Sequence, residues 1–127
     1  MAGIVVRDAH FPGRAPVDSY GNGGFRFAGM SHRGSILCLP SGIYGWQPPE
    51  AGIDRASLAR VFEDAAEIEV LLIGTGREMV MLAPDLAAAL REARIVADTM
   101  STGAAARTYS VLLAEDRAVA AALVAVD

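Results

Sequence analysis

The sequence predicts one α/β domain over residues 1–127, with a largely parallel sheet, three main helices and a β-hairpin region near the N-terminus. Three observations support this prediction. The length of 127 residues suits a single domain. Hydrophobic residues make up 53% of the chain and charged residues 20%, a composition typical of globular proteins. In the middle of the chain, apolar runs alternate with segments of helical periodicity, and this order implies crossover connections between parallel strands.

The first part of the chain is expected to contain strands and loops. Residues 4–6 favour a short strand, and the Gly- and Pro-rich residues 10–24 favour a loop. Apolar residues alternate over residues 25–28 and return over residues 35–39, so these two runs are predicted to pair as a hairpin. The turn of that hairpin is expected near residues 32–34.

Residues 44–49 are expected to be irregular, because neither Pro48 nor Pro49 fits the interior of a sheet ladder or a helix. Tyr44 and Trp46 lie in this segment. Aromatic side chains in a loop can anchor a protein interface, so Tyr44 and Trp46 are candidate interface residues. The alternative is that both side chains fold back over the core.

The central part of the chain carries the clearest signals. Asp54 suits the N-cap of a helix over residues 55–66, where apolar residues recur at helical spacing. Residues 70–73 are continuously apolar and predict a strand that is buried on both faces. Pro84 suits the first turn of a second helix, and residues 95–97 predict the next strand.

The C-terminal part begins with a predicted third helix, which Ser101 or Thr102 can cap. The final apolar stretch, residues 118–126, is ambiguous from its pattern, because its alanines favour a helix and its valines favour a strand. This stretch is about half the length that a membrane-spanning helix needs, so no transmembrane segment is expected.

Charge and cysteine content narrow the function classes. The net charge of −4 is spread along the chain without a basic stripe, which argues against a nucleic-acid binder. Cys38 is the only cysteine, so no internal disulfide can form, and a reducing compartment is expected. The protein is therefore expected to be soluble and cytoplasmic.

Two segments suggest a site for a small ligand or anion at one edge of the predicted sheet. Ligands of open parallel sheets bind outside the carboxyl ends of the strands. Amides and hydroxyls at a helix start could hold an anion there, and an arginine could add a charge-assisted hydrogen bond. The candidate ligand-binding residues are Gly74, Thr75, Gly76, Ser101, Thr102 and Arg107. The plainer interpretation is that the glycines form tight turns and that one hydroxyl only caps the helix.

Catalysis finds little support in the residue pattern. Cys38 alternates within an apolar run, where a thiol behaves as a small hydrophobe. His10 and His32 fall in loop-like segments and form no recognisable metal set with one cysteine. No catalytic residue, metal or cofactor is predicted, and an enzyme is disfavoured. Arg26 lies between two phenylalanines and should face away from their core side, to pair with a carboxylate or to meet a ligand or partner.

Several segments in one order and spacing span about the whole chain. They are Gly23-Gly24-Phe25-Arg26-Phe27, Gly34-Ser35-Ile36-Leu37, Pro40 with Gly42 and Trp46, Leu72-Ile73-Gly74-Thr75-Gly76, residues 98–105, Arg107-Thr108-Tyr109 and Leu113-Ala114-Glu115. Together they resemble the family of the mitochondrial complex I assembly factor 3 and its uncharacterised prokaryotic relatives, a domain of unknown function. One departure is Ser110, where the family pattern usually has Asn.

The resemblance implies a three-layer fold with a central mixed sheet, and a strand for residues 118–126. It implies no enzyme activity, and the mitochondrial branch of the family acts in respiratory complex assembly through protein partners. The leading hypothesis is therefore a non-catalytic interaction module that assists assembly of a respiratory or membrane protein complex. The alternative is a small-ligand or anion-binding protein that uses the residue 74–76 loop and the helix start at Ser101. The protein partner and the oligomeric state stay open.

Overall fold

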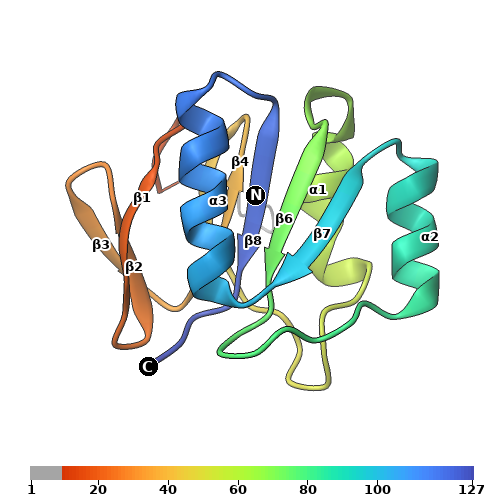
Figure 1. The fold of residues 1–127 in the computed structure, drawn as a ribbon, viewed down its shortest axis with the longest axis horizontal. Helices are drawn as coiled ribbons and strands as arrows, with labels where there is room; N and C mark the ends of the chain where they lie inside the picture. Colours follow the sequence, from red (N-terminus) through yellow and green to blue (C-terminus); the bar gives the residue numbers. More distant parts are fainter. Residues whose placement is uncertain (1–9) are drawn as a thin grey trace, which may run out of the picture.

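The computed structural model describes residues 10–127. In this part of the chain, five strands form a mixed sheet, three strands form a separate antiparallel sheet, and three helices pack against them (Figure 1). The elements in chain order are β1 (Val17–Gly21), β2 (Gly24–Phe27), β3 (Met30–Arg33), β4 (Ser35–Leu39), β5 (Gly42–Trp46), α1 (Ala59–Glu63), β6 (Val70–Gly74), α2 (Pro84–Glu92), β7 (Val96–Met100), α3 (Thr102–Ala114) and β8 (Val119–Leu123). Short 3-10 turns, Ala56–Leu58 and Ala65–Glu67, flank α1.

The five-stranded sheet has the order β5-β4-β8-β6-β7. Strand β6 runs parallel to both of its neighbours, whereas β4 runs antiparallel to both β5 and β8. Four of these five strands therefore point in the same direction, and the prediction of a mixed sheet with crossover connections is confirmed.

The terminal apolar stretch supplies β8, which lies at the centre of the sheet with all five residues buried. This confirms the strand that the family resemblance implied and resolves the ambiguity of the sequence pattern. Helix propensity is a weak preference, and burial between two neighbouring strands overrides it for this alanine-rich segment.

The core has two halves, one on each face of the five-stranded sheet. Ile36 and Cys38 of β4 face α3 and the three-stranded sheet, whereas Leu37 and Leu39 face α1 and α2. This alternation buries β4 on both faces, so the three-layer arrangement is confirmed. In Figure 1, α3 and β1–β3 cover one side of the sheet, and α2 flanks β7 at the far edge.

The N-terminal prediction was wrong in its pairing. Strand β2 pairs with β3 rather than with β4, and β1 forms inside the segment that was expected to be a loop. The β2–β3 turn falls at Ala28 and Gly29, both with positive φ, and not at residues 32–34. Gly34, with φ +101°, instead lets the chain leave β3 and enter the central sheet at Ser35. The predicted strand at residues 4–6 lies outside the described residues.

Two further elements differ from the expectation. Residues 44–46 belong to β5, so the irregular segment starts only after Trp46. The predicted helix over residues 55–66 is broken into α1 and its two 3-10 turns. Asp54 nevertheless makes the expected contact, because its carboxylate accepts the Ser57 amide at 2.8 Å.

The second and third helices begin where the sequence predicts. Pro84 is the first residue of α2, and Ser101 is the N-cap of α3, where its hydroxyl accepts the Ala104 amide at 3.3 Å. Ser110 of α3 accepts the Val17 amide and donates to the Val17 carbonyl, at 3.1 and 3.3 Å. A serine at this position therefore ties α3 to β1 through both backbone groups of one residue.

Candidate functional site

A large groove of the described chain lies at the carboxyl ends of β6 and β8. This groove has a volume of about 1020 Å³, and Thr75 and Val124, which follow the two strands, are among its lining residues. The chain that leaves β6 continues to α2 on one face of the sheet. The chain that leaves β8 runs toward the other face, where the Gly23 amide of the β1–β2 turn donates a hydrogen bond to the Val126 carbonyl. Such a divergence at neighbouring strand ends is where open α/β sheets place their ligands.

The first wall of the groove is formed by residues 47–54, and hydrogen bonds anchor both of its ends. The Trp46 indole donates to the Ser57 carbonyl at 2.8 Å. Asp54 and Ser57 exchange hydrogen bonds, since the Ser57 amide donates to the Asp54 carboxylate and the Ser57 hydroxyl accepts the Asp54 amide. These bonds anchor the wall at Trp46, just before its first residue, and at Asp54, its last residue.

The second wall is residues 80–83, and Thr75 shapes the turn that leads to it. The Thr75 hydroxyl donates to the Glu78 carbonyl at 2.7 Å and accepts the Val80 amide at 2.9 Å. The turn leaves Met79, Val80 and Met81 exposed by 52%, 59% and 77%. Three consecutive exposed apolar side chains beside a groove form an apolar surface of the kind that marks interaction sites. We call residues 79–81 the apolar loop.

The predicted ligand-binding residues lie near this groove, but their polar groups serve the protein itself. The structure brings Gly76 and Thr102 together: the Gly76 amide donates to the Thr102 hydroxyl at 3.0 Å, and the Thr102 amide donates to the Gly76 carbonyl at 2.7 Å. Thr102 is fully buried. Ser101 caps α3, and the Thr75 hydroxyl is engaged in its own turn. The Gly76 amide, the Thr102 amide and the Thr75 hydroxyl therefore donate to groups of the protein itself.

The two glycines of the loop meet backbone requirements. A Cβ on Gly74 would lie 2.8 Å from the Thr102 Cα, so only glycine allows β6 and α3 to approach this closely. Gly76 has φ +117°, a conformation that other residues rarely adopt. Arg107 is exposed on α3 and is not among the groove's lining residues, so the structure does not join it to the other candidates.

The predicted interface aromatics point largely inward. Trp46 is only 7% exposed and packs among the buried residues on the α1 and α2 face of the sheet. Tyr44 is half-buried, with its hydroxyl 2.8 Å from the Ser41 hydroxyl and its ring 4.1 Å from the Arg60 guanidinium. The geometry matches the alternative in which both side chains fold back over the core, although Trp46 also lines the groove.

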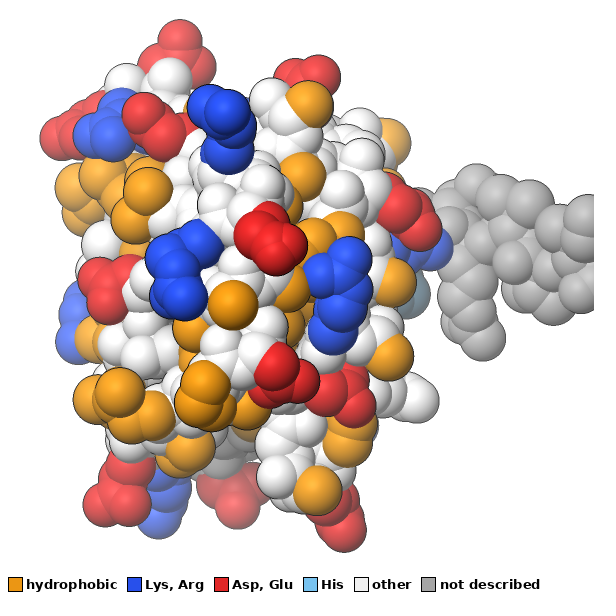
Figure 2. Space-filling view, turned by 90° about the vertical axis from the view of Figure 1, so that its right-hand side faces the viewer, with side chains coloured by type: hydrophobic (Ala, Val, Ile, Leu, Met, Phe, Trp, Pro, Cys, Tyr) orange, Lys and Arg blue, Asp and Glu red, His pale blue; other side chains and the backbone are white. Residues whose placement is uncertain are grey.

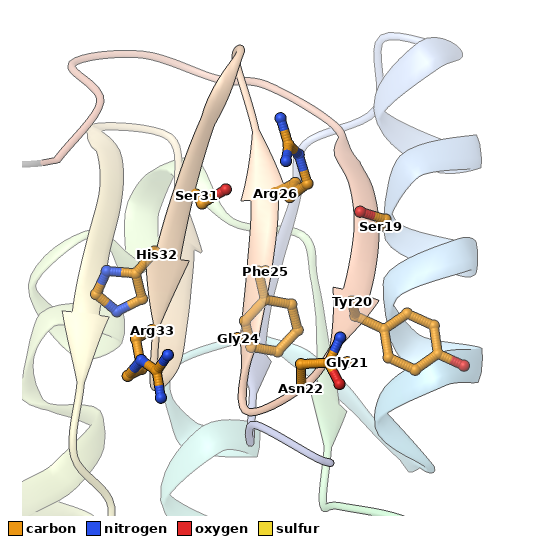
Figure 3. Close-up of a pocket in the computed structure, with 10 residues that line it drawn as sticks. All are labelled: Ser19, Tyr20, Gly21, Asn22, Gly24, Phe25, Arg26, Ser31, His32 and Arg33. Atoms are coloured by element: carbon orange, nitrogen blue, oxygen red, sulfur yellow. The ribbon is translucent and has the colours of Figure 1, made fainter.

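A second hollow, of about 490 Å³, lies on the three-stranded sheet (Figure 3). Ser19, Arg26 and Ser31 are cross-strand neighbours and share one face of this sheet. Arg26 is exposed and makes no ion pair with a described residue. Arg26 therefore faces outward, where it can meet a ligand or partner, and does not pair with a carboxylate of the described residues. This is one of the two roles that the sequence left open.

The apolar loop is the feature that sequence reasoning missed. Met79, Val80 and Met81 form an apolar run before Pro84, but the run has no period that separates a buried strand from an exposed turn. The face over α2 and β7 has a different character from the apolar loop. Figure 2 shows charged side chains of both signs interspersed with apolar ones on that face.

Three findings bear on other functions of residues 10–127. Burial raises the pKa of the Cys38 thiol to about 12, so it stays protonated in the folded protein. The described residues contain no group of three or more His, Cys, Asp or Glu that could hold a metal ion. None of the described helices has the length and apolar character that a membrane crossing requires.

The chain resembles curated proteins over most of its length. An uncharacterised protein of Rhodobacter capsulatus is 38% identical over 120 residues, which are 94% of this chain and 92% of that protein. The NADH dehydrogenase (ubiquinone) 1 alpha subcomplex assembly factor 3 of mouse is 28% identical over 122 residues. That alignment covers 95% of this chain but 66% of the mouse protein, so the chain spans just under two thirds of that relative.

Solved structures show the same fold. A crystal structure described as an outer membrane protein from Bartonella henselae is 63% identical and superposes with a TM-score of 0.90, over 93% of this chain and all of that one. A solution structure of a Mth938-like domain from Bordetella pertussis is 28% identical, with a TM-score of 0.70 over 95% of this chain and 90% of that one. A family model described as a protein of unknown function (DUF498/DUF598) matches residues 17–124. The chain therefore belongs to this family, as the sequence resemblance predicted.

Proposed function

We propose that this protein is a non-catalytic interaction module that assists assembly of the respiratory NADH dehydrogenase complex, and that its apolar loop contacts the partner. The relatives named as assembly factors of that complex support the role. The apolar loop supports the place, because it exposes three consecutive apolar side chains, and two of them, Val80 and Met81, line the groove of about 1020 Å³. We place this action in the cytoplasm, as the single thiol of Cys38 suggests.

The local structure suits a docking role. An exposed Met side chain adapts to different apolar surfaces, because it is unbranched and polarisable. The Thr75 hydrogen bonds hold the turn that presents the apolar loop, so part of the ordering cost of binding is met before the partner arrives. The opposite wall is fixed by Trp46 and Asp54, which gives the groove a stable shape for an apolar partner segment.

The test is complementation in cells of the protein's own species that lack it. The amount of assembled NADH dehydrogenase complex in their membranes is measured on native gels. Wild-type protein should restore the complex, and Met81→Glu should not, because a carboxylate placed in an apolar interface loses its hydration. Val111→Glu is the matched control, since Val111 is an apolar residue of α3 that is 56% exposed.

Both variants should fold and accumulate like wild type, because they change exposed side chains. If removal of the protein leaves the complex at its normal amount, the proposed function is wrong. If Met81→Glu restores the complex as well as Val111→Glu does, the apolar loop is not the contact surface.

A further inference from the structure

The hollow of about 490 Å³ on the three-stranded sheet carries two arginines and no carboxylate among its described lining residues (Figure 3). Arg26 of β2 and Arg33 of β3 both line it, and both side chains are exposed. Neither guanidinium has a hydrogen bond or ion pair with another described residue. The chain as a whole has a net charge of −4, so this surface is an exception to its general character. We call it the arginine face.

The strand register places the two arginines at a defined separation. Arg26 lies opposite Ser31 of β3, and Arg33 is two residues further along that strand, so the arginines are diagonal neighbours on one face of the sheet. Diagonal neighbours usually have their Cβ atoms about 7–8 Å apart. In Figure 3, Arg26 and Arg33 lie toward opposite ends of the hollow. The arginine face therefore offers two separate contacts for anionic groups.

The backbone that carries the arginines is well anchored. All four residues of β2 pair with residues of both β1 and β3. Phe25 and Phe27 are buried in the core, on the side of β2 that is opposite to Arg26. A Cβ on Gly24 would collide with the His32 carbonyl, so the glycine lets β3 come close to β2 just before Arg33. A partner therefore needs to order only the arginine side chains when it binds.

Polar and aromatic groups suited to a peptide partner surround the arginines. Ser19 and Ser31 are the cross-strand neighbours of Arg26 on its two sides, and neither hydroxyl bonds to another described residue. Each hydroxyl can donate a hydrogen bond to a carboxylate or to a peptide carbonyl. Tyr20 lines the same hollow and is 42% exposed. Tyrosine and arginine are among the residue types that contribute most to protein interfaces.

An extended acidic peptide segment matches this surface. In an extended strand, every second side chain points to the same side, and these side chains recur about every 7 Å. Carboxylates at every second position could therefore meet Arg26 and Arg33 together, each through charge-assisted hydrogen bonds. A single small anion would engage one end of the face. A nucleic acid is a poorer match, because its affinity comes from many phosphate contacts, whereas this face presents two arginines on a chain of net charge −4.

We propose that the arginine face binds an extended acidic segment of a partner protein, in which Asp or Glu recurs at every second residue. This inference goes beyond the docking role of the apolar loop, because the arginine face and the groove of about 1020 Å³ share no lining residue. Binding at one surface therefore does not require binding at the other.

The test measures binding of fluorescent peptides to the full chain by fluorescence anisotropy at low salt. The probe is a short peptide in which glutamate alternates with threonine. One comparison peptide has glutamine in place of glutamate, and another has the same composition as the probe with its glutamates grouped at one end. The alternating peptide should bind most tightly, the grouped peptide more weakly, and the glutamine peptide not at all. Added salt should weaken binding, because the arginines are exposed.

Substitutions on the arginine face should identify it as the binding site. Arg26→Gln and Arg33→Gln should each weaken binding of the alternating peptide by about tenfold, the loss expected for one charge-assisted hydrogen bond. Arg26→Lys should lose part of the affinity, because lysine keeps the charge but lacks the planar fork of donors. Arg91→Gln is the matched control, since Arg91 is an exposed arginine of α2 outside this hollow, and it should bind as wild type does. Met81→Glu should also bind normally, which separates this surface from the apolar loop.

The arginine variants should fold like wild type, because they change exposed side chains, and circular dichroism checks this. The proposal is overturned if the alternating peptide does not bind, or if Arg26→Gln and Arg33→Gln bind it as tightly as Arg91→Gln does. Equal binding of the grouped and alternating peptides would also overturn it, because the spacing of the carboxylates would then not matter. Tighter binding of a single-stranded DNA of similar charge would overturn it in favour of a nucleic-acid partner.

Discussion

Thr102 and Gly76 are joined by two reciprocal hydrogen bonds, with the Gly76 amide on the Thr102 hydroxyl at 3.0 Å and the Thr102 amide on the Gly76 carbonyl at 2.7 Å. The same hydroxyl donates to the Val124 carbonyl at 2.7 Å. One buried side chain thus connects the loop after β6, the start of α3 and the end of β8.

The Thr102 hydroxyl should therefore be important for stability. Thr102→Val keeps the shape of the side chain but leaves the part-buried Gly76 amide and Val124 carbonyl without this partner, which should cost about 1–3 kcal/mol in the free energy of unfolding. Denaturant unfolding measures the loss. Thr108 is a half-buried residue of the same helix, and Thr108→Val should change the free energy of unfolding much less than Thr102→Val does. Equal stability of Thr102→Val and wild type would contradict this role.

Trp46 should prove to be a structural residue. Trp46→Ala should lower the free energy of unfolding by about 3–5 kcal/mol, because it removes a large buried ring and leaves a cavity. Trp46→Phe should cost less, since a ring remains and the lost bond to the Ser57 carbonyl contributes about 1 kcal/mol. Urea titrations compare the two. A fully stable Trp46→Ala protein that has lost partner binding would show instead that Trp46 is an interface anchor.

Cys38 should react slowly with thiol reagents in the folded protein. Its pKa is raised to about 12 by burial, so at pH 8 few molecules carry the reactive thiolate, and the side chain has no exposed surface. A chromogenic disulfide reagent should label it quickly in denaturant and, without denaturant, only as fast as the protein opens. Rapid labelling of the native protein at pH 8 would contradict the buried placement.

The pH dependence of stability should carry a contribution from His32. Its pKa is lowered in the folded protein from 6.5, first by burial and then by His10. Arg33, Tyr44 and Arg60 line the same hollow of about 460 Å³ as the two histidines. The unfolded chain therefore binds this proton more tightly, so protons are taken up on unfolding and stability falls as the pH drops below about 6.5.

His32→Gln removes that proton uptake, so its stability should fall less steeply between pH 7 and pH 5 than that of wild type. Thermal unfolding in a buffer without phosphate or carboxylate measures the two profiles. Identical profiles would show that His32 titrates normally in the folded protein.

The sequence predicts the middle of the chain better than its beginning. The strand at residues 70–73, the start of α2 at Pro84 and the cap of α3 at Ser101 follow from local signals, namely a continuous apolar run, a fixed φ and a capping hydroxyl. The pairing of β2 with β3 depends on contacts between separate segments, which periodicity does not encode. Asn22-Gly23 is the available signal for the β1–β2 turn, since both residues have positive φ, as hairpin turns require.

The site was harder to predict for a related reason. The sequence places Gly76 and Thr102 at one edge of the sheet, and the structure brings them together. Whether their donors face solvent or each other depends on three-dimensional packing. Apolar side chains are usually buried, so residue type alone predicts burial for Met79, Val80 and Met81, whereas the structure exposes all three.

The most direct test of the proposed docking surface is site-specific photo-crosslinking in cells of the protein's own species. A photoreactive side chain is placed at Met81 in one version of the protein and at Val111 in the other, two exposed apolar positions, one in the apolar loop and one on α3. Crosslinking from position 81 should yield an adduct that contains a subunit of the NADH dehydrogenase complex, and position 111 should not. Adducts with no such subunit at position 81, or the same adducts at both positions, would contradict docking through the apolar loop.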